Sequence, residues 1–191
     1  MNESGPFAAG RAVFLDRDGV LNEAIVRDGK PYPPAGIHQL KLVPGAALAL
    51  QRLKQASFLL IVVTNQPDVA RGKQTREGVE TLHAAIAAAL PLDAFFVCWH
   101  DDRDRCECRK PKPGLLLEAA SRYAIDFRRS FLIGDRWRDI DAGAAAGCRT
   151  IQIDRGYNEK PPQSQPDFHA SSLTEAVEWI VGASLEPGAV R

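Results

Sequence analysis

The stretch AVFLDRDG, residues 12–19, joins an apolar run to two aspartates and a glycine. Its opening residues, AVFL, are of strand length and wholly apolar, as in strands that are buried on both faces of a parallel sheet. If the strand continues through Asp16, the alternation of side chains lets Asp16 and Asp18 face the same side. Gly19 then allows the backbone to turn away. The stretch therefore predicts a buried strand whose carboxyl end presents two carboxylates.

Four more apolar runs of strand length follow, at residues 58–63, 94–98, 130–133 and 150–153. Helical patterns fill the gaps at residues 44–56, 75–90, 113–123 and 137–146, and a last helix runs from Ser172 to about Ile180. Thr75 is suited to cap its helix, and Ser172 with Glu175 forms a capping box. The alternation predicts a doubly wound, Rossmann-like α/β fold, with a parallel five-stranded sheet and helices on both faces. We expect one domain over residues 11–182, between flexible tails at 1–10 and 183–191.

The chain of 191 residues carries 24 basic and 24 acidic residues, so its formal net charge is zero. This balance gives no global argument for nucleic acid or an anionic membrane as a partner. No apolar run approaches the roughly 18 residues that span a bilayer, and the start of the chain lacks the pattern of a secretory signal. We therefore expect a cytoplasmic protein that binds neither nucleic acid nor membranes. No strong signal for a dimer is present, and a monomer is expected.

Ligands of open α/β sheets bind beyond the carboxyl ends of the strands. Polar residues follow four of the predicted strands at this edge: Asp16 and Asp18, Thr64 and Asn65, Cys98 and His100, Asp135 and Asp139. The carboxylates of Asp16, Asp18 and Asp135 would form an oxygen-rich site suited to magnesium. The alternative is that the first two aspartates merely end a strand with polar residues, because short motifs often match by chance.

A second metal site is predicted from one imidazole and three thiols, contributed by Cys98, His100, Cys106 and Cys108. Four ligands of this type form the closed tetrahedral set of structural zinc, which leaves no open position for catalysis. The alternative is a group of free thiols beside a chance histidine. In a reducing compartment, such a cluster indicates a metal site before a disulfide. Cys148 and the other histidines, His38, His83 and His169, lack such neighbours.

Four stretches occur in a fixed order: AVFLDRDGVLNE at 12–23, IVVTNQPDVARG at 61–72, CRKPKPG at 108–114 and FLIGDRWRDIDAG at 131–143. With these motifs the chain resembles the haloacid dehalogenase superfamily of phosphatases. More narrowly, it resembles the branch of the heptose 1,7-bisphosphate phosphatases and the related histidinol-phosphate phosphatases, which carry the same cysteine and histidine pairs. The resemblance extends from about Arg11 to Trp179, which is nearly the whole chain.

The resemblance implies a role for each matching residue. Asp16 would attack the phosphorus and form an aspartyl-phosphate, while Asp18 would protonate the leaving oxygen and later accept a proton from water. Magnesium would be held by a carboxylate oxygen of Asp16, the backbone carbonyl of Asp18, and Asp135. Thr64 would donate a hydrogen bond to a phosphoryl oxygen, and Lys110 would supply positive charge to the same group.

Four other residues have less definite roles. Asp139 would support the metal shell or orient Lys110, or else serve only as a partner of the helix dipole. Arg109 follows the zinc ligands and is assigned to the second phosphate or the sugar of the substrate, although a run of basic residues is often only a solvated surface. Asn65 is expected to contact sugar or phosphate. For Arg17, directions into the site and away from it both stay open.

The expected substrate is a phosphorylated sugar, a heptose 1,7-bisphosphate that loses its 7-phosphate on the way to bacterial surface glycans. About twenty residues separate Asn22 from Pro44, too few for the separate cap domain of many relatives. The site would be shielded only by residues 28–34, residues 66–72 and the loop that carries Cys98, His100, Cys106 and Cys108, here called the zinc loop. The segments DGVLN and KPYPP favour the heptose branch, but many heptose enzymes have Ser-Gly where this chain has Pro67 and Asp68.

Three other functions remain as alternatives. Histidinol phosphate is the nearest alternative substrate, since its phosphatases share the zinc pattern. A polynucleotide 3′-phosphatase shares the nucleophile motif, but the neutral net charge and the lack of a basic stripe weigh against it. A catalytically silent binding protein on the same fold is disfavoured because Asp16, Asp18, Lys110 and Asp135 are all present.

Overall fold

The centre of the fold is a parallel sheet of six strands in the order β5-β4-β1-β6-β7-β8, within residues 10–185, which the computed structural model describes. The strands are β1 (Ala12–Leu15), β4 (Leu59–Asn65), β5 (Ala94–Cys98), β6 (Phe131–Gly134), β7 (Arg149–Ile153) and β8 (Phe168–Ala170). The five predicted strands are all present, and the predicted doubly wound α/β fold is confirmed. The predicted number of strands is wrong, because β8 pairs with the edge of β7. It has only three residues, with an exposed His169 at its centre, so it lacks a continuous apolar run.

The strands are apolar throughout because their side chains alternate between two cores. Val13 and Leu15 of β1 point into the core on one face of the sheet, while Ala12 and Phe14 point into the core on the other. All four side chains are fully buried. Burial on both faces removes any need for polar positions within the strand.

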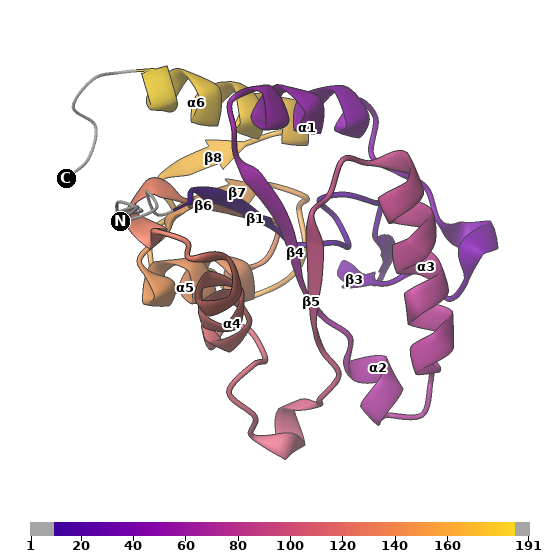
Figure 1. The fold of residues 1–191 in the computed structure, drawn as a ribbon. Coiled ribbons are helices and arrows are strands. Elements are labelled where there is room, and N and C mark those ends of the chain that lie inside the picture. Colours follow the sequence, from indigo (N-terminus) through magenta and orange to yellow (C-terminus); the bar gives the residue numbers. More distant parts are fainter. Residues whose placement is uncertain (1–9, 186–191) are drawn as a thin grey trace, which may run out of the picture.

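Helices cover both faces of the sheet (Figure 1). The helices α1 (Ala46–Gln55), α3 (Arg76–Ala89) and α6 (Leu173–Leu185) contribute to the first core. The helices α4 (Gly114–Tyr123) and α5 (Trp137–Ala146) contribute to the second. Figure 1 shows α1 and α6 above the sheet and α4 and α5 below it.

The predicted helix caps are present, with one change. The Thr75 hydroxyl accepts a hydrogen bond from the Gly78 amide at 3.0 Å. The Ser172 hydroxyl accepts one from the Glu175 amide at 3.2 Å, but the Glu175 carboxylate accepts from the amide of Ser171 rather than Ser172. The helix α6 continues to Leu185, so the predicted tail cannot begin at residue 183. Residues 1–9 and 186–191, the rest of the two predicted tails, lie outside the described residues.

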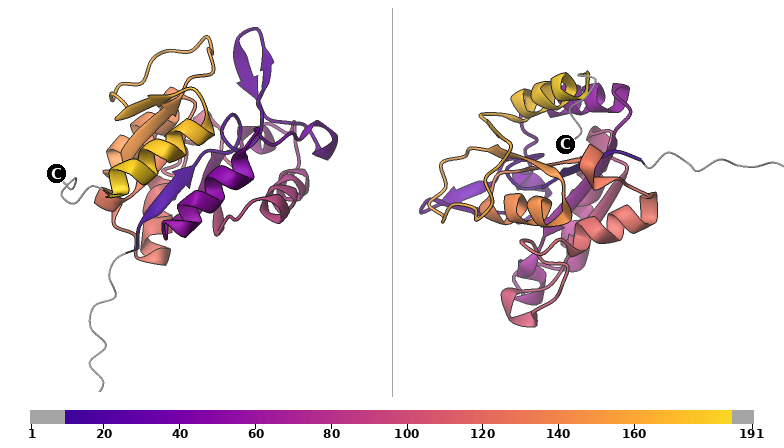
Figure 2. Two further views of the ribbon diagram at one scale, coloured as in Figure 1. Left: turned by 90° about the horizontal axis from the view of Figure 1, so that it is seen from above. Right: turned by 90° about the vertical axis from the view of Figure 1, so that its left-hand side faces the viewer.

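Short excursions leave the carboxyl edge of the sheet in place of a cap domain. The first is a hairpin of β2 (Ile25–Arg27) and β3 (Lys30–Tyr32), which projects from the body in Figure 2 and is followed by the turn η1 (Ile37–Gln39). The others hold α2 (Pro67–Ala70) and the turn η2 (Asp102–Asp104), while a third turn, η3 (Phe127–Arg129), precedes β6. The hairpin was not predicted because its residues are largely exposed and bury no apolar face. None of the helices in the described part of the chain is both long and apolar enough to cross a lipid bilayer.

Candidate active site

A cavity of about 270 Å³ opens at the carboxyl edge of the sheet, where β1, β4 and β6 end. Six of the residues predicted for catalysis or substrate binding line it: Asp16, Asp18, Thr64, Asn65, Arg109 and Lys110. All three segments predicted to shield the site also contribute to its wall, through Tyr32 of the hairpin, Arg71 after α2, and Asp102 of the zinc loop. The structure thus brings together residues that are up to 94 positions apart.

Lys110 lines the cavity and forms three hydrogen bonds with buried acceptors. Its Nζ donates hydrogen bonds to Asp16 Oδ1 at 2.6 Å, to Asp139 Oδ1 at 2.5 Å and to the Val63 carbonyl at 2.7 Å. The side chain is buried, with 2% of its surface exposed. Burial opposes its charge, but the carboxylates of Asp139 and Asp16 outweigh this effect and raise the pKa of Lys110. Lys110 therefore remains a cation in direct contact with Asp16.

Lys110 contacts two of three buried carboxylates that lie close together. One oxygen each from Asp16, Asp135 and Asp139 lies within 4.8 Å of the others. Burial raises the pKa of Asp16 to about 6 against the opposing charge of Lys110, with Asp139 and Asp18 adding to the rise. Burial, reinforced by Asp16 and Asp139, also raises the pKa of Asp135 well above its usual value. One lysine cannot balance three carboxylates.

Asp135 is the residue with the clearest capacity to bind a metal. Both of its oxygens are buried, and neither has a partner within residues 10–185 at hydrogen-bond distance and angle, although the Tyr157 hydroxyl lies near enough to oppose the rise in the pKa of Asp135. Buried polar atoms are normally paired, so two orphaned oxygens beside two further carboxylates fit a divalent cation. Gly19, with φ at +92°, makes the site possible, since a Cβ atom there would lie 1.7 Å from Asp135 Oδ2. The residues present therefore fit magnesium, but the third carboxylate of the group is that of Asp139, whereas the sequence predicted that of Asp18, which is paired with Arg17.

The side chain of Asp18 is held on the other side of the cavity floor by Arg17. Both oxygens of Asp18 accept from the Arg17 guanidinium at 2.8–3.1 Å, and they also accept from Asn22 Nδ2 and Gln66 Nε2. Burial alone would raise the pKa of Asp18, but the ion pair and these hydrogen bonds hold it below its usual value. Asp18 is therefore ionised in the absence of substrate.

Arg17 is fully buried and is not among the residues that line the cavity, and its guanidinium group lies between Asp18 and His83. Its Nη1 lies 3.0 Å from His83 Nε2, and the His83 ring stacks on Phe95 with the ring centroids 4.7 Å apart. Burial and the neighbouring guanidinium lower the pKa of His83 to about 4, so the imidazole is neutral and accepts from Arg17. No local pattern indicates this contact, because the two residues are 66 positions apart.

Thr64 and Asn65, at the end of β4, are both engaged within the protein. The Thr64 hydroxyl accepts from Gln66 Nε2 at 2.9 Å, which leaves its proton free to donate. The side-chain amide of Asn65 forms two hydrogen bonds with the backbone of Lys110. It donates to the Lys110 carbonyl and accepts from the Lys110 backbone amide, each at 3.1 Å. Asn65 thus positions Lys110, and its contact with substrate stays a prediction.

Asp139 combines two of the roles considered for it. Its Oδ1 contacts Lys110 Nζ, and its Oδ2 accepts from the Arg136 amide at 3.1 Å at the start of α5. Gly134 leaves room for this arrangement, because a Cβ atom there would lie 2.1 Å from the Cβ of Asp139. The helix start and the orientation of the lysine therefore depend on the same carboxylate.

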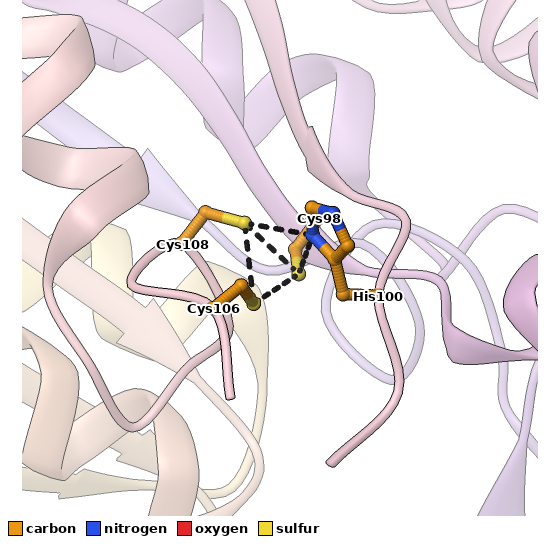
Figure 3. Close-up of side chains that lie close together, drawn as sticks. All are labelled: Cys98, His100, Cys106 and Cys108. Carbon is orange, nitrogen blue, oxygen red and sulfur yellow. Dashed lines mark hydrogen bonds between the residues drawn. The ribbon is translucent and has the colours of Figure 1, made fainter. Parts of the chain in front are cut away.

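The predicted zinc ligands converge, and Figure 3 shows the four side chains close together. The three sulfur atoms lie 3.2–3.7 Å apart, and His100 Nδ1 lies 3.3 Å from Cys108 Sγ and 3.8 Å from Cys98 Sγ. Zinc–sulfur bonds of about 2.3 Å in a tetrahedron place the ligands roughly 3.8 Å apart, so the set fits zinc. Burial raises the pKa of the Cys98 thiol, and a cation at the centre would favour its thiolate.

Comparisons with known proteins agree with this geometry. A family model described as "HAD-hyrolase-like", that is, haloacid dehalogenase-like hydrolases, matches residues 107–176. The D-glycero-D-manno-heptose-1,7-bisphosphate 7-phosphatase of Thermosynechococcus vestitus is 35% identical over 193 residues, which cover 88% of this chain and 94% of the relative. The D-glycero-beta-D-manno-heptose-1,7-bisphosphate 7-phosphatase of Pasteurella multocida is 37% identical over 185 residues, which cover 90% and 97%.

A solved structure is similar over the same range. The crystal structure of D,D-heptose 1,7-bisphosphate phosphatase from B. bronchiseptica, complexed with magnesium and phosphate, matches with a TM-score of 0.76 at 30% identity. The match covers 90% of this chain and 98% of that chain.

Proposed function

This chain belongs to the haloacid dehalogenase family of phosphatases, in the branch of the heptose bisphosphate phosphatases, and from this premise we propose that it removes the 7-phosphate from D-glycero-D-manno-heptose 1,7-bisphosphate. The resemblance expected from the four motifs is thereby confirmed. The observation that carries the proposal is the contact of the buried Lys110 with Asp16 beside the orphaned oxygens of Asp135. A location in the cytoplasm and a monomeric state stay predictions.

Asp16 is the proposed nucleophile. Its free carboxylate oxygen would bond to phosphorus as the bond between phosphorus and the sugar oxygen breaks, which gives an aspartyl-phosphate and a free hydroxyl group on the sugar. Water would then attack the phosphorus, release phosphate and regenerate Asp16. Magnesium, held by Asp16, Asp135 and the Asp18 carbonyl, would neutralise charge on the phosphoryl group, as suits a relative crystallised with magnesium and phosphate.

Asp18 is the proposed acid and base of these steps. It is ionised beside Arg17, and a bound phosphoryl group would bring negative charge close to it. Nearby negative charge raises the pKa of a carboxyl group, so substrate binding favours the protonated form that can give its proton to the leaving oxygen. The ionised form then accepts a proton from the attacking water.

Lys110 and Thr64 would stabilise the transferred group. Three acceptors, one of them Asp16, hold Lys110 Nζ in place. Its positive charge therefore need not move when the phosphoryl oxygens approach. The free proton of the Thr64 hydroxyl would donate to one of these oxygens. Both groups are buried, and low solvent access strengthens their interaction with developing charge.

The test of the substrate is a panel that compares both anomers of the heptose bisphosphate, histidinol phosphate and a nucleic-acid 3′-phosphate. We expect the highest kcat/KM for one heptose bisphosphate anomer. Histidinol phosphate belongs in the panel because Asp68, in the position that is Gly in many heptose enzymes, lines the cavity and could pair with an amine. A higher kcat/KM for histidinol phosphate would overturn the substrate proposed here.

Replacing Asp135 with asparagine should separate metal binding from folding. In magnesium-free buffer we expect the variant to be more stable than the wild type by on the order of 1 kcal/mol, or about 2–4 °C in Tm, because one of three crowded carboxylates is neutralised. Magnesium should raise the Tm of the wild type but not of the variant. Asp154→Asn, at an exposed position outside this carboxylate group, is the matched control and should respond to magnesium like the wild type. An equal magnesium response in Asp135→Asn would exclude Asp135 as a ligand.

Removal of the proposed zinc should destabilise the loop that leads to Arg109 and Lys110. We expect about one zinc per purified chain, and we expect Cys98→Ser to lose it and to unfold at several degrees lower Tm, because structural zinc contributes directly to folding. Cys148→Ser is the control, since Cys148 is also buried but lies outside the ligand set. Elemental analysis and thermal unfolding measure both effects. Full metal content in Cys98→Ser would refute the ligand assignment.

A further inference from the structure

Two guanidinium groups share one carboxylate at the wall of the cavity. Arg109 Nε donates to Asp102 Oδ1 at 2.8 Å, and Arg138 Nη1 lies 3.4 Å from the same oxygen. The three residues come from separate places: the end of the zinc loop, the first turn of α5, and the turn η2 within the zinc loop. All three line the cavity that also holds Asp16.

This cluster carries an excess of positive charge. The other arginines that line the cavity have carboxylates of their own, since Arg71 pairs with Asp68 and Asp101 and Arg136 pairs with Glu159. Arg109 and Arg138 have no carboxylate other than Asp102 within 4.0 Å among residues 10–185. Burial, together with Arg109 and Arg136, lowers the pKa of Arg138 although Asp102 opposes this. A second anionic group would therefore be favourable here.

The carboxylate is the most accessible member of the cluster. The Asp102 side chain is 53% exposed, whereas those of Arg109 and Arg138 are 11% and 24% exposed. An exposed ion pair of this kind is weak, so a stronger anion can displace the carboxylate toward solvent at little cost. The guanidinium groups would stay in place, because Arg109 also contacts the His100 carbonyl and Arg138 Nη1 lies 3.5 Å from the Lys110 carbonyl.

We propose that Arg138 is a specificity residue that binds the second phosphate of a bisphosphate substrate together with Arg109, and that Asp102 occupies this position until substrate arrives. The inference rests on the proposed function, because only a substrate with two phosphates fills both places. A phosphate dianion offers several oxygens to two planar guanidinium groups, which a single carboxylate oxygen does not. Arg138 contacts the backbone of the same lysine whose Nζ contacts Asp16, so the second phosphate is fixed relative to the nucleophile.

The test compares Arg138→Gln and Asp102→Asn with the wild type on two substrates, the heptose 1,7-bisphosphate and heptose 7-phosphate, which lacks the second phosphate. Arg138→Gln should raise KM for the bisphosphate about tenfold or more while kcat stays within about twofold, as expected for the loss of one charge-assisted hydrogen bond. It should leave KM for the monophosphate unchanged. Asp102→Asn should lower KM for the bisphosphate, because the competing carboxylate is gone. Arg138→Lys should recover part of the loss, since it keeps the charge without the planar group.

Arg103→Gln is the matched control for the loss of an arginine. Arg103 lies in the turn η2 beside Asp102, is exposed and does not line the cavity. It should leave both KM values unchanged. An unchanged KM for the bisphosphate in Arg138→Gln, with turnover intact, would overturn this inference alone. An equal rise for both substrates would also overturn it, since Arg138 would then act on the shared phosphoryl site. If the wild type fails to hydrolyse the bisphosphate but hydrolyses another monoester in the panel, the proposed function itself is wrong.

Discussion

Asp16→Asn should lower kcat by on the order of 10⁴-fold or more, because an amide is a poor nucleophile and no second carboxylate can replace it. Asp139 is tied to Lys110 and to the start of α5, and Asp18 is tied to Arg17, so neither is free to attack. The measurement is kcat under saturating substrate and magnesium, together with an acid quench of the enzyme during turnover of labelled substrate. The wild type should retain acid-stable phosphate on the protein, and the variant should retain none.

The folded state of this variant should survive. The asparagine amide has the same shape, and its oxygen can still accept from Lys110 Nζ, which keeps Asp139 and the Val63 carbonyl as its other acceptors. We expect a Tm within a few degrees of the wild type and a substrate Kd near the wild-type KM, so that the lost turnover reflects chemistry. Asp141→Asn, which changes an aspartate of α5 outside the cavity, should keep its activity. Undiminished turnover by Asp16→Asn would remove the covalent mechanism.

The sequence alone could locate the rim of the site because the sheet is parallel. Asp16, Thr64 and Asp135 follow separate apolar runs, and in a parallel sheet the carboxyl ends of those runs meet at one edge. Local patterns sufficed for this step, since β1, β4 and β6 are buried on both faces and are almost wholly apolar. The backbone hydrogen bond from the Asp16 amide to the Ile133 carbonyl, at 3.0 Å, extends the ladder beyond β1 as expected.

Other parts of the site depend on contacts that no local pattern records. Lys110 follows no strand, so its place came only from the resemblance to a known family. The contact of Arg17 with His83 and the convergence of Arg138 on Asp102 join residues whose identities are common on surfaces. From the sequence alone, a basic residue near the zinc loop or in the first turn of a helix is predicted to lie in solvent. Only the fold shows which side chains it contacts. The strand β8 could not be predicted from local patterns either, because it is defined by its pairing with β7.

Lys110→Met should reduce both stability and turnover, because it removes the only cation that touches Asp16 and Asp139 in the described part of the chain. Methionine preserves most of the volume, so the change is chiefly electrostatic. Breaking a buried ion pair from one side typically costs about 3–5 kcal/mol, and losing a fixed positive charge beside the transferred group costs roughly 10²–10³-fold in kcat. Urea unfolding in magnesium-free buffer and steady-state kinetics with magnesium measure the two effects separately.

The control is Lys112→Met, because Lys112 pairs only with the exposed Glu107 at 2.7 Å and should contribute a few tenths of a kcal/mol. Adding Asp139→Asn to Lys110→Met should restore part of the lost stability, since it removes one of the stranded carboxylates, but it should restore no turnover. That difference follows from the two demands on Lys110. Folding requires only that buried negative charge be balanced, which neutralising an aspartate also achieves, whereas catalysis requires a positive charge fixed beside the phosphoryl group. If Lys110→Met proved as stable as Lys112→Met, the loss of this cation from beside Asp16 and Asp139 would cost nothing, and the electrostatic role of Lys110 in folding would be refuted.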